Sequence, residues 1–255
     1  MRSKKEQQEI EINIDKILEF LADANVTGTF FTLGNIAKEQ PQVVRKIAEA
    51  GHEIGSHSYF HKRLYNFNKE KIFEYISSSK KELEDASGSK VFGFRAPDFS
   101  INQKTIFILD MILECGFTYD SSIFPISGHD VYGISNAKPN IHHIRPGLLE
   151  FPPSTYKLMG CNLPILGGGY FRLSPLMLSS YFLKYLEKKN RPGMVYIHPF
   201  EMGGEFPIIK NLSRLQYFRH YVNITKSMYR FKKLFKKYEF GPAIDILNNY
   251  QNSHL

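Results

Sequence analysis

Residues 51–61 read GHEIGSHSYFH, and this stretch anchors the prediction of the fold. Residues 52–54 form a short strand candidate that Gly55 closes, and His57 and His61 follow it four positions apart. On a helical turn, that spacing places two imidazoles on one face, where they can share one metal ion. Zinc suits nitrogen ligands, although spacing alone leaves other divalent metals open. The alternative is two solvated histidines in a loop, which is the better interpretation of an isolated pair.

Helical and strand-like runs alternate on both sides of this stretch. Apolar residues recur at helical spacing in four segments, and β-rich runs stand between them. The helical segments are 10–21, 43–48, 72–83 and 102–115, and the β-rich runs are 29–33, 91–94 and 117–121. Pro41 is expected to open the second helix and Asn68 to cap the third. The alternation predicts an α/β fold, with βα units around a mainly parallel sheet or barrel.

The second half of the chain has a different composition and periodicity. Residues 123–169 are rich in Pro, Gly, His and Ser, which predicts loops and short strands. Helical spacing returns at 176–186, and residues 194–197 form a buried strand candidate. An amphipathic basic helix near residues 230–237, followed by a short tail, is expected to end the chain. The whole chain of 255 residues is expected to be a single domain, with a core over about 9–122 and a C-terminal part over about 123–240.

Composition excludes several classes of protein. Hydrophobic residues make up 42% of the chain and charged residues 23%, which argues against disorder and fibrous classes. No apolar run is long enough to span a membrane, and the N-terminus has no signal-peptide pattern, so a cytoplasmic location is expected. Two cysteines, Cys115 and Cys161, are too few for a disulfide framework or a cysteine-based zinc site. The net charge of +8 lies largely in the basic helix, and no nucleic-acid-binding module accompanies it.

Two further segments carry chemistry at the ends of strand candidates. FRAPDFS, residues 94–100, puts Arg95 after a strand, where it can orient a carboxylate bidentately, and Pro97 stiffens the loop. YIHPFE, residues 196–201, puts His198 after an apolar strand, where it is placed for proton transfer. An ordinary surface arginine and a structural histidine bonded to a backbone carbonyl are the alternatives.

Taken in this order, the three segments resemble the polysaccharide deacetylase (NodB-homology) family. The resemblance runs from about residue 29 to 240 and extends to the branch found with bacterial exopolysaccharide gene clusters, whose C-terminal part has its own signature. The matching motifs are TFF at 29–31, GHE at 51–53, Ser56, His57 and His61, RAP at 95–97, YDSS at 119–122, His129 and Asp130, Tyr132 and Gly133, EFP at 150–152, GGGYFR at 167–172, His198, Pro199 and Glu201, and FRHY at 218–221.

The resemblance implies a deformed (β/α) barrel that removes acetyl groups from N-acetylated sugars of a polysaccharide or a lipid-linked glycan. By this similarity His57 and His61 hold a divalent metal, zinc above others, that activates water. Arg95 orients the catalytic base and His198 protonates the departing amine. The further site residues implied are Asp120 for catalysis and Pro97, Tyr170 and Arg172 for substrate binding, with Asp130 and Glu150 as candidates for tuning His198. The glycines at 167–169 bring backbone amides close to substrate or form a tight turn.

The family's first motif is a strand that ends in acidic residues, which supply the base and the third metal ligand. Here the sequence opens almost at the first helix, and neither Asp15 nor Asp23 follows a strand. The barrel is therefore expected to lack its first strand, with impaired activity. Either the true start lies upstream, the gene is a fragment, or the chain is a glycan-binding pseudoenzyme. We favour the first two over the third, and place polyanion or membrane binding through the basic helix behind them all.

Overall fold

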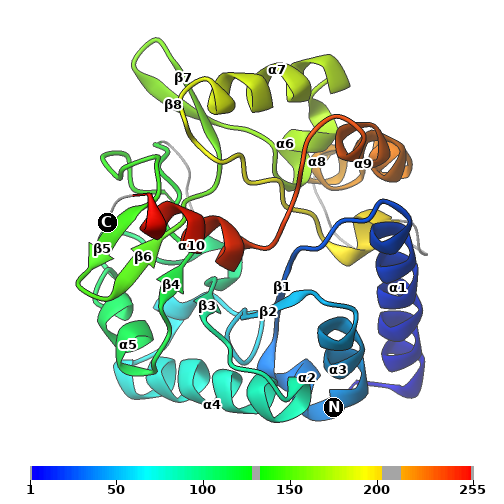
Figure 1. Ribbon diagram of the computed structural model, residues 1–255. Coiled ribbons are helices and arrows are strands. Elements are labelled where there is room, and N and C mark those ends of the chain that lie inside the picture. The colour runs from blue at the N-terminus through cyan, green and yellow to red at the C-terminus, as the bar shows by residue number, and fades with distance from the viewer. Residues whose placement is uncertain (1, 128–132, 203–213, 254–255) are drawn as a thin grey trace. The chain divides into compact units, whose positions relative to one another are not determined.

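The computed structural model describes residues 2–127, 133–202 and 214–253 (Figure 1). The chain forms two compact units. The sheet unit comprises Thr27–Leu163 and Gly241–Leu255, and the helical unit comprises Arg2–Val26 and Pro164–Phe240. The single domain expected over residues 1–255, with its division near residue 122, stays a prediction.

A six-stranded sheet is the centre of the sheet unit. Its order is β1-β2-β3-β4-β6-β5, and every pair is parallel except β5 with β6. The strands are β1 (Thr29–Thr32), β2 (Glu53–Ser56), β3 (Gly93–Phe94), β4 (Tyr119–Asp120), β5 (His142–Arg145) and β6 (Leu148–Glu150), and a separate two-stranded sheet pairs β7 (Thr155–Leu158) with β8 (Cys161–Pro164). This confirms the predicted α/β fold with a mainly parallel sheet. Within the described residues, β1 and β5 are its two ends and the barrel is not closed.

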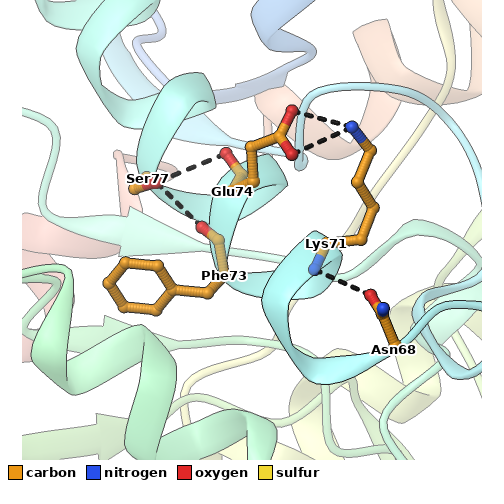
Figure 2. Close-up of polar contacts among 5 residues, drawn as sticks. All are labelled: Asn68, Lys71, Phe73, Glu74 and Ser77. Carbon is orange, nitrogen blue, oxygen red and sulfur yellow. Dashed lines mark hydrogen bonds and ion pairs between the residues drawn. The ribbon is translucent and has the colours of Figure 1, made fainter.

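Helices separate the parallel strands, as the alternation predicted. They are α2 (Gly34–Glu39), α3 (Pro41–Glu49), α4 (Lys69–Ser87) and α5 (Ile108–Glu114). Pro41 opens α3, and the Asn68 side chain caps α4 by accepting a hydrogen bond from the Lys71 backbone N–H (Figure 2). The Lys71 ammonium also donates to the Glu74 carboxylate within α4. The Ser77 hydroxyl donates to the Phe73 carbonyl one turn earlier in the helix (Figure 2).

The core of the sheet unit lies against α4, whose apolar side chains Ile72, Ile76 and Leu83 are almost fully buried.

A polar contact joins β2 to β4, two strands that are not neighbours in the sheet. Tyr119 donates a hydrogen bond from its hydroxyl to Glu53 at 2.8 Å. The Tyr119 ring packs so closely on Gly93 that a Cβ there would lie 2.0 Å from the ring carbon Cζ. Glycine at this position is therefore required by packing.

Three predicted elements need correction. Residues 194–197 form no strand: within the described residues, Tyr196 makes only an isolated bridge to Gly167. Gly55 lies inside β2 rather than closing it. The chain does not end in a tail after the basic helix, because α10 (Ala243–Asn252) follows (Figure 1). The backbone N–H groups of Ala243 and Ile244 bond Thr29 and Glu53, which fixes the start of α10 on the sheet unit.

The helical unit contains α1 (Lys4–Asp23), α6 (Gly168–Leu173), α7 (Leu176–Glu187), α8 (Arg214–Tyr221) and α9 (Ser227–Phe235). The predicted basic helix is α9, which buries Phe231 and Leu234 and leaves its lysines toward solvent. Phe235 of α9 packs on Phe20 of α1, with ring centroids 5.7 Å apart. In the part of the chain that the structure describes, no helix has the length and apolar character that a membrane crossing needs.

Candidate functional site

His57 and His61 come together at the end of β2. The His57 backbone N–H bonds the Thr32 carbonyl on β1, and the two ring centroids lie 5.1 Å apart. The spacing argument assumed a helical turn, but residues 57–61 form a loop, the alternative considered for this segment, in which Ser58 has a φ of 66°. That left-handed residue turns the chain, so two histidines at this spacing still face the same region.

The ring orientation of His57 suits a metal ligand. Its Nδ1 lies 2.7 Å from the Arg95 carbonyl oxygen, and because a carbonyl only accepts, Nδ1 donates. The lone pair is thereby assigned to Nε2, the arrangement that orients many metal-bound histidines. No cluster of three or more His, Cys, Asp or Glu side chains suited to a metal occurs among the residues that the structure describes. The two imidazoles therefore fit part of a metal site.

Arg95 is an interior residue, so the alternative of a surface arginine is wrong. The residue is 9% exposed, and its side chain donates to the carbonyl of Ser121 at 3.2 Å and to the Ser121 hydroxyl at 2.7 Å. The guanidinium carbon lies 4.2 Å from the ring centroid of Phe31, a cation–π contact. Pro97 is also buried and begins the short 3₁₀ helix Pro97–Phe99. Arg95 thus ties the loop that follows β3 to the end of β4 and to β1.

Asp120 and Glu150 form a pair of buried carboxyl groups. They stand opposite each other in the register of β4 and β6, and neither is exposed. Asp120 accepts from the backbone N–H of Ser122 at 3.1 Å and from its hydroxyl at 2.6 Å, and Glu150 accepts from the Ile123 N–H at 3.0 Å. Burial raises the pKa of both groups, and the neighbouring Asp120 raises that of Glu150 further. This pairing was not predicted, although both acids end strand-like runs.

His198 lies in the helical unit at the start of the 3₁₀ helix Pro199–Met202. Its side chain is 50% exposed, whereas that of Glu201 is 1% exposed. Glu201 accepts from the His198 backbone N–H at 3.0 Å, and its other oxygen lies 3.6 Å from the imidazole Nδ1. Arg172, 3% exposed, forms an ion pair with the same carboxylate.

The glycines at 167 and 168 are explained by packing on the residues before His198. A Cβ on Gly167 would lie 1.9 Å from the Tyr196 ring, and the Gly168 N–H bonds the Tyr196 carbonyl at 2.9 Å. Tyr170 is half-buried on α6. His129, Asp130 and Tyr132 lie outside the described residues.

Family models cover nearly the whole chain. Residues 10–119 match the model described as polysaccharide deacetylase, and residues 121–248, half of the chain, match a domain of unknown function, DUF3473. The chain belongs to the family that carries DUF3473, and its residues 10–119 form a polysaccharide deacetylase domain. This confirms the resemblance drawn from the motifs.

Named relatives align with less than half of this chain. It is 35% identical over 75 residues to peptidoglycan-N-acetylmuramic acid deacetylase PdaA of Bacillus subtilis, covering 29% of this chain and 28% of that protein. It is 38% identical over 82 residues to a chitooligosaccharide deacetylase of Azorhizobium caulinodans, covering 32% and 39%. The chain thus spans less than two fifths of each of these relatives.

Solved structures share the fold of this family member at low identity. A Mycobacterium smegmatis protein assigned to the polysaccharide deacetylases superposes with a TM-score of 0.65 at 20% identity, covering 97% of this chain and 79% of that one. The allantoinase PuuE gives 0.61 at 18% identity, covering 95% and 73%. A family 4 carbohydrate esterase pseudoenzyme from Bacillus anthracis gives 0.50 at 18%, covering 93% and 61%.

Proposed function

We propose that the chain hydrolyses the acetamide groups of N-acetylated sugar residues in a glycan. The observation that carries the proposal is His57, whose Nδ1 is bonded to the Arg95 carbonyl while its ring centroid lies 5.1 Å from that of His61. Two imidazoles oriented in this way suit a divalent cation, and zinc is our preferred ion. Family membership and the deacetylase names of the relatives support the same chemistry.

Each site residue has a role in this proposal. His57 and His61 would hold the cation, which when bound lowers the pKa of water and polarises a carbonyl oxygen. Arg95 is held by Ser121 and Phe31, so it presents a fixed positive charge for orienting a carboxylate. His198, half exposed and backed by Glu201, would give a proton to the departing amine. Asp120, next to the Ser121 that holds Arg95, is a further catalytic candidate, and Pro97 and Tyr170 are candidates for binding substrate.

The test is release of acetate from a chitin pentasaccharide and from peptidoglycan, followed by mass spectrometry. We expect the glycan to lose about 42 Da per acetyl group in a zinc-dependent reaction, because hydrolysis replaces each acetyl group with a hydrogen atom. The reaction should stop with a chelator and with His57→Ala. Acetate release that survives both changes would overturn the metal assignment.

A second candidate is a glycan-binding protein without catalysis. It is favoured by the absence, among the described residues, of a third acidic or imidazole side chain near His57 and His61. Saturable binding of the pentasaccharide without acetate release, under zinc-loaded conditions, would support it. We also propose that the substrate is an exopolysaccharide or its lipid-linked precursor. Comparing acetate release from the chitin pentasaccharide with release from peptidoglycan shows which type of glycan the chain prefers.

A further inference from the structure

Two segments of the helical unit are locked together around His198. Tyr196 forms an isolated parallel bridge with Gly167. The Gly168 N–H donates to the Tyr196 carbonyl at 2.9 Å, and the Tyr196 N–H donates to the Leu166 carbonyl at 3.3 Å. Because a Cβ on Gly167 would collide with the Tyr196 ring, the two backbones approach as closely as glycine allows. This fixes α6, which carries Arg172, against the segment that carries His198.

Glu201 uses both carboxylate oxygens within this arrangement. Oε2 accepts the His198 backbone N–H at 3.0 Å, and Oε1 is shared between the Arg172 guanidinium and the imidazole Nδ1, the latter at 3.6 Å. The carboxylate is 1% exposed and the imidazole 50% exposed. The buried acid therefore stands behind an imidazole that reaches solvent on its other side.

Arg172 is itself held from several directions. Its Nε donates to the Val222 carbonyl at 3.2 Å, while its own carbonyl accepts from Asn223 at 3.0 Å and from Arg230 at 2.7 Å. Burial lowers the pKa of Arg172, yet a guanidinium stays charged at all ordinary pH values. A buried carboxylate is costly without a counter-charge, and Arg172 supplies one to Glu201.

We propose that Arg172 and Glu201 are positioning residues that hold the His198 imidazole with Nδ1 toward the protein and Nε2 toward the reacting group. This rests on the proposed function, in which His198 delivers a proton. Arg172 then acts through Glu201 rather than on the substrate. A carboxylate beside one imidazole nitrogen selects the tautomer and stabilises the imidazolium, which is what a proton donor to an amine needs.

The test combines the histidine tautomer with kinetics. Long-range ¹H–¹⁵N spectra, with the His198 signal assigned by His198→Gln, should show the proton on Nδ1 in the neutral ring. Glu201→Ala should move the neutral ring toward the other tautomer and lower kcat about 10- to 100-fold with little change in KM. Arg172→Gln should act in the same direction, and Arg172→Lys, which keeps the charge, should restore part of kcat.

Glu187→Ala, at the exposed end of α7, is the matched control and should change neither tautomer nor kcat. Melting curves of each variant separate misfolding from repositioning, and Arg172→Lys serves where Arg172→Gln fails to fold. An unchanged His198 tautomer in a folded Glu201→Ala variant would overturn the positioning role. If the tautomer moves as expected but the parent chain releases no acetate, the proposed function fails while the positioning of His198 stands.

Discussion

Asp120 on β4 faces Glu150 on β6 across a parallel strand pair, and both carboxyl groups are fully buried. Ionising both carboxyl groups would place two negative charges side by side in the interior, at a high cost in free energy. The two groups therefore titrate as a coupled pair, which retains a proton above the usual pKa range of carboxyl groups. Arg95 is the nearby positive charge that offsets part of this cost for Glu150. The pair therefore makes the end of the sheet sensitive to pH.

Glu150→Gln tests this coupling. The folded-state pKa of Glu150 is raised, so its contribution to stability is fully present below the unfolded-state pKa and is lost as pH rises through the folded one. We expect Glu150→Gln to gain stability relative to the parent chain as pH rises above 4.5, the usual pKa of a glutamate, by about 1–3 kcal/mol in urea unfolding. Glu114→Gln, at an exposed position on α5, should show no such gain. Parallel pH profiles for Glu150→Gln and the parent would contradict the coupling.

Zinc affinity tests the histidine pair. His57→Ala and His61→Ala each remove one of two nitrogen ligands, and we expect zinc binding in calorimetry to weaken at least about 10-fold. His143→Ala removes an exposed histidine of β5 in the same unit and should leave the affinity unchanged. Equal affinity in all three variants would place the zinc elsewhere.

Gly93→Ala tests the contact of β3 with Tyr119. The added methyl group would meet the Tyr119 ring, displacing the hydroxyl that bonds Glu53. We expect a loss of about 1–3 kcal/mol in the free energy of unfolding. Gly28→Ala is the control, because a Cβ there meets nothing within 4 Å, and its effect should stay within about 0.5 kcal/mol. Similar losses in both variants would mean that packing on Tyr119 is not the cause.

Truncation after residue 240 tests the role of α10. It removes the backbone donors of Ala243 and Ile244 that bond Thr29 and Glu53. Burial already raises the pKa of Glu53, and losing a donor increases the cost of its charge. We expect the melting temperature to fall by more than about 4 °C, compared with a control that lacks only residues 254–255. Unchanged melting would show that α10 is dispensable for the sheet unit.

The sequence predicted those features that local chemistry determines. Pro41 and Asn68 begin helices through backbone geometry and a side-chain cap, and both do so here. His57 and His61 lie close together, through a loop with Ser58 in a left-handed conformation rather than through a helical turn, and their metal binding stays a prediction.

Features that depend on distant partners were missed. The pairing of Asp120 with Glu150 requires β4 to lie next to β6 instead of β5, which no local pattern states. The strand expected at 194–197 is reduced to one bridge at Gly167. The start of α10 is fixed by Thr29 and Glu53, about two hundred positions away along the chain, so short-range periodicity gave no reason to expect it there.

The junction between the two family models has an evolutionary consequence. One model ends at residue 119 and the other begins at 121, so their junction lies within β4. β4 pairs with β3 from the first half and with β6 from the second, which makes the sheet a joint product of both. Recombination at this junction would exchange half of a sheet, not a self-contained module. The two halves are therefore expected to have been inherited and to have diversified together, with substitutions on β4 and β6 compensating one another across lineages.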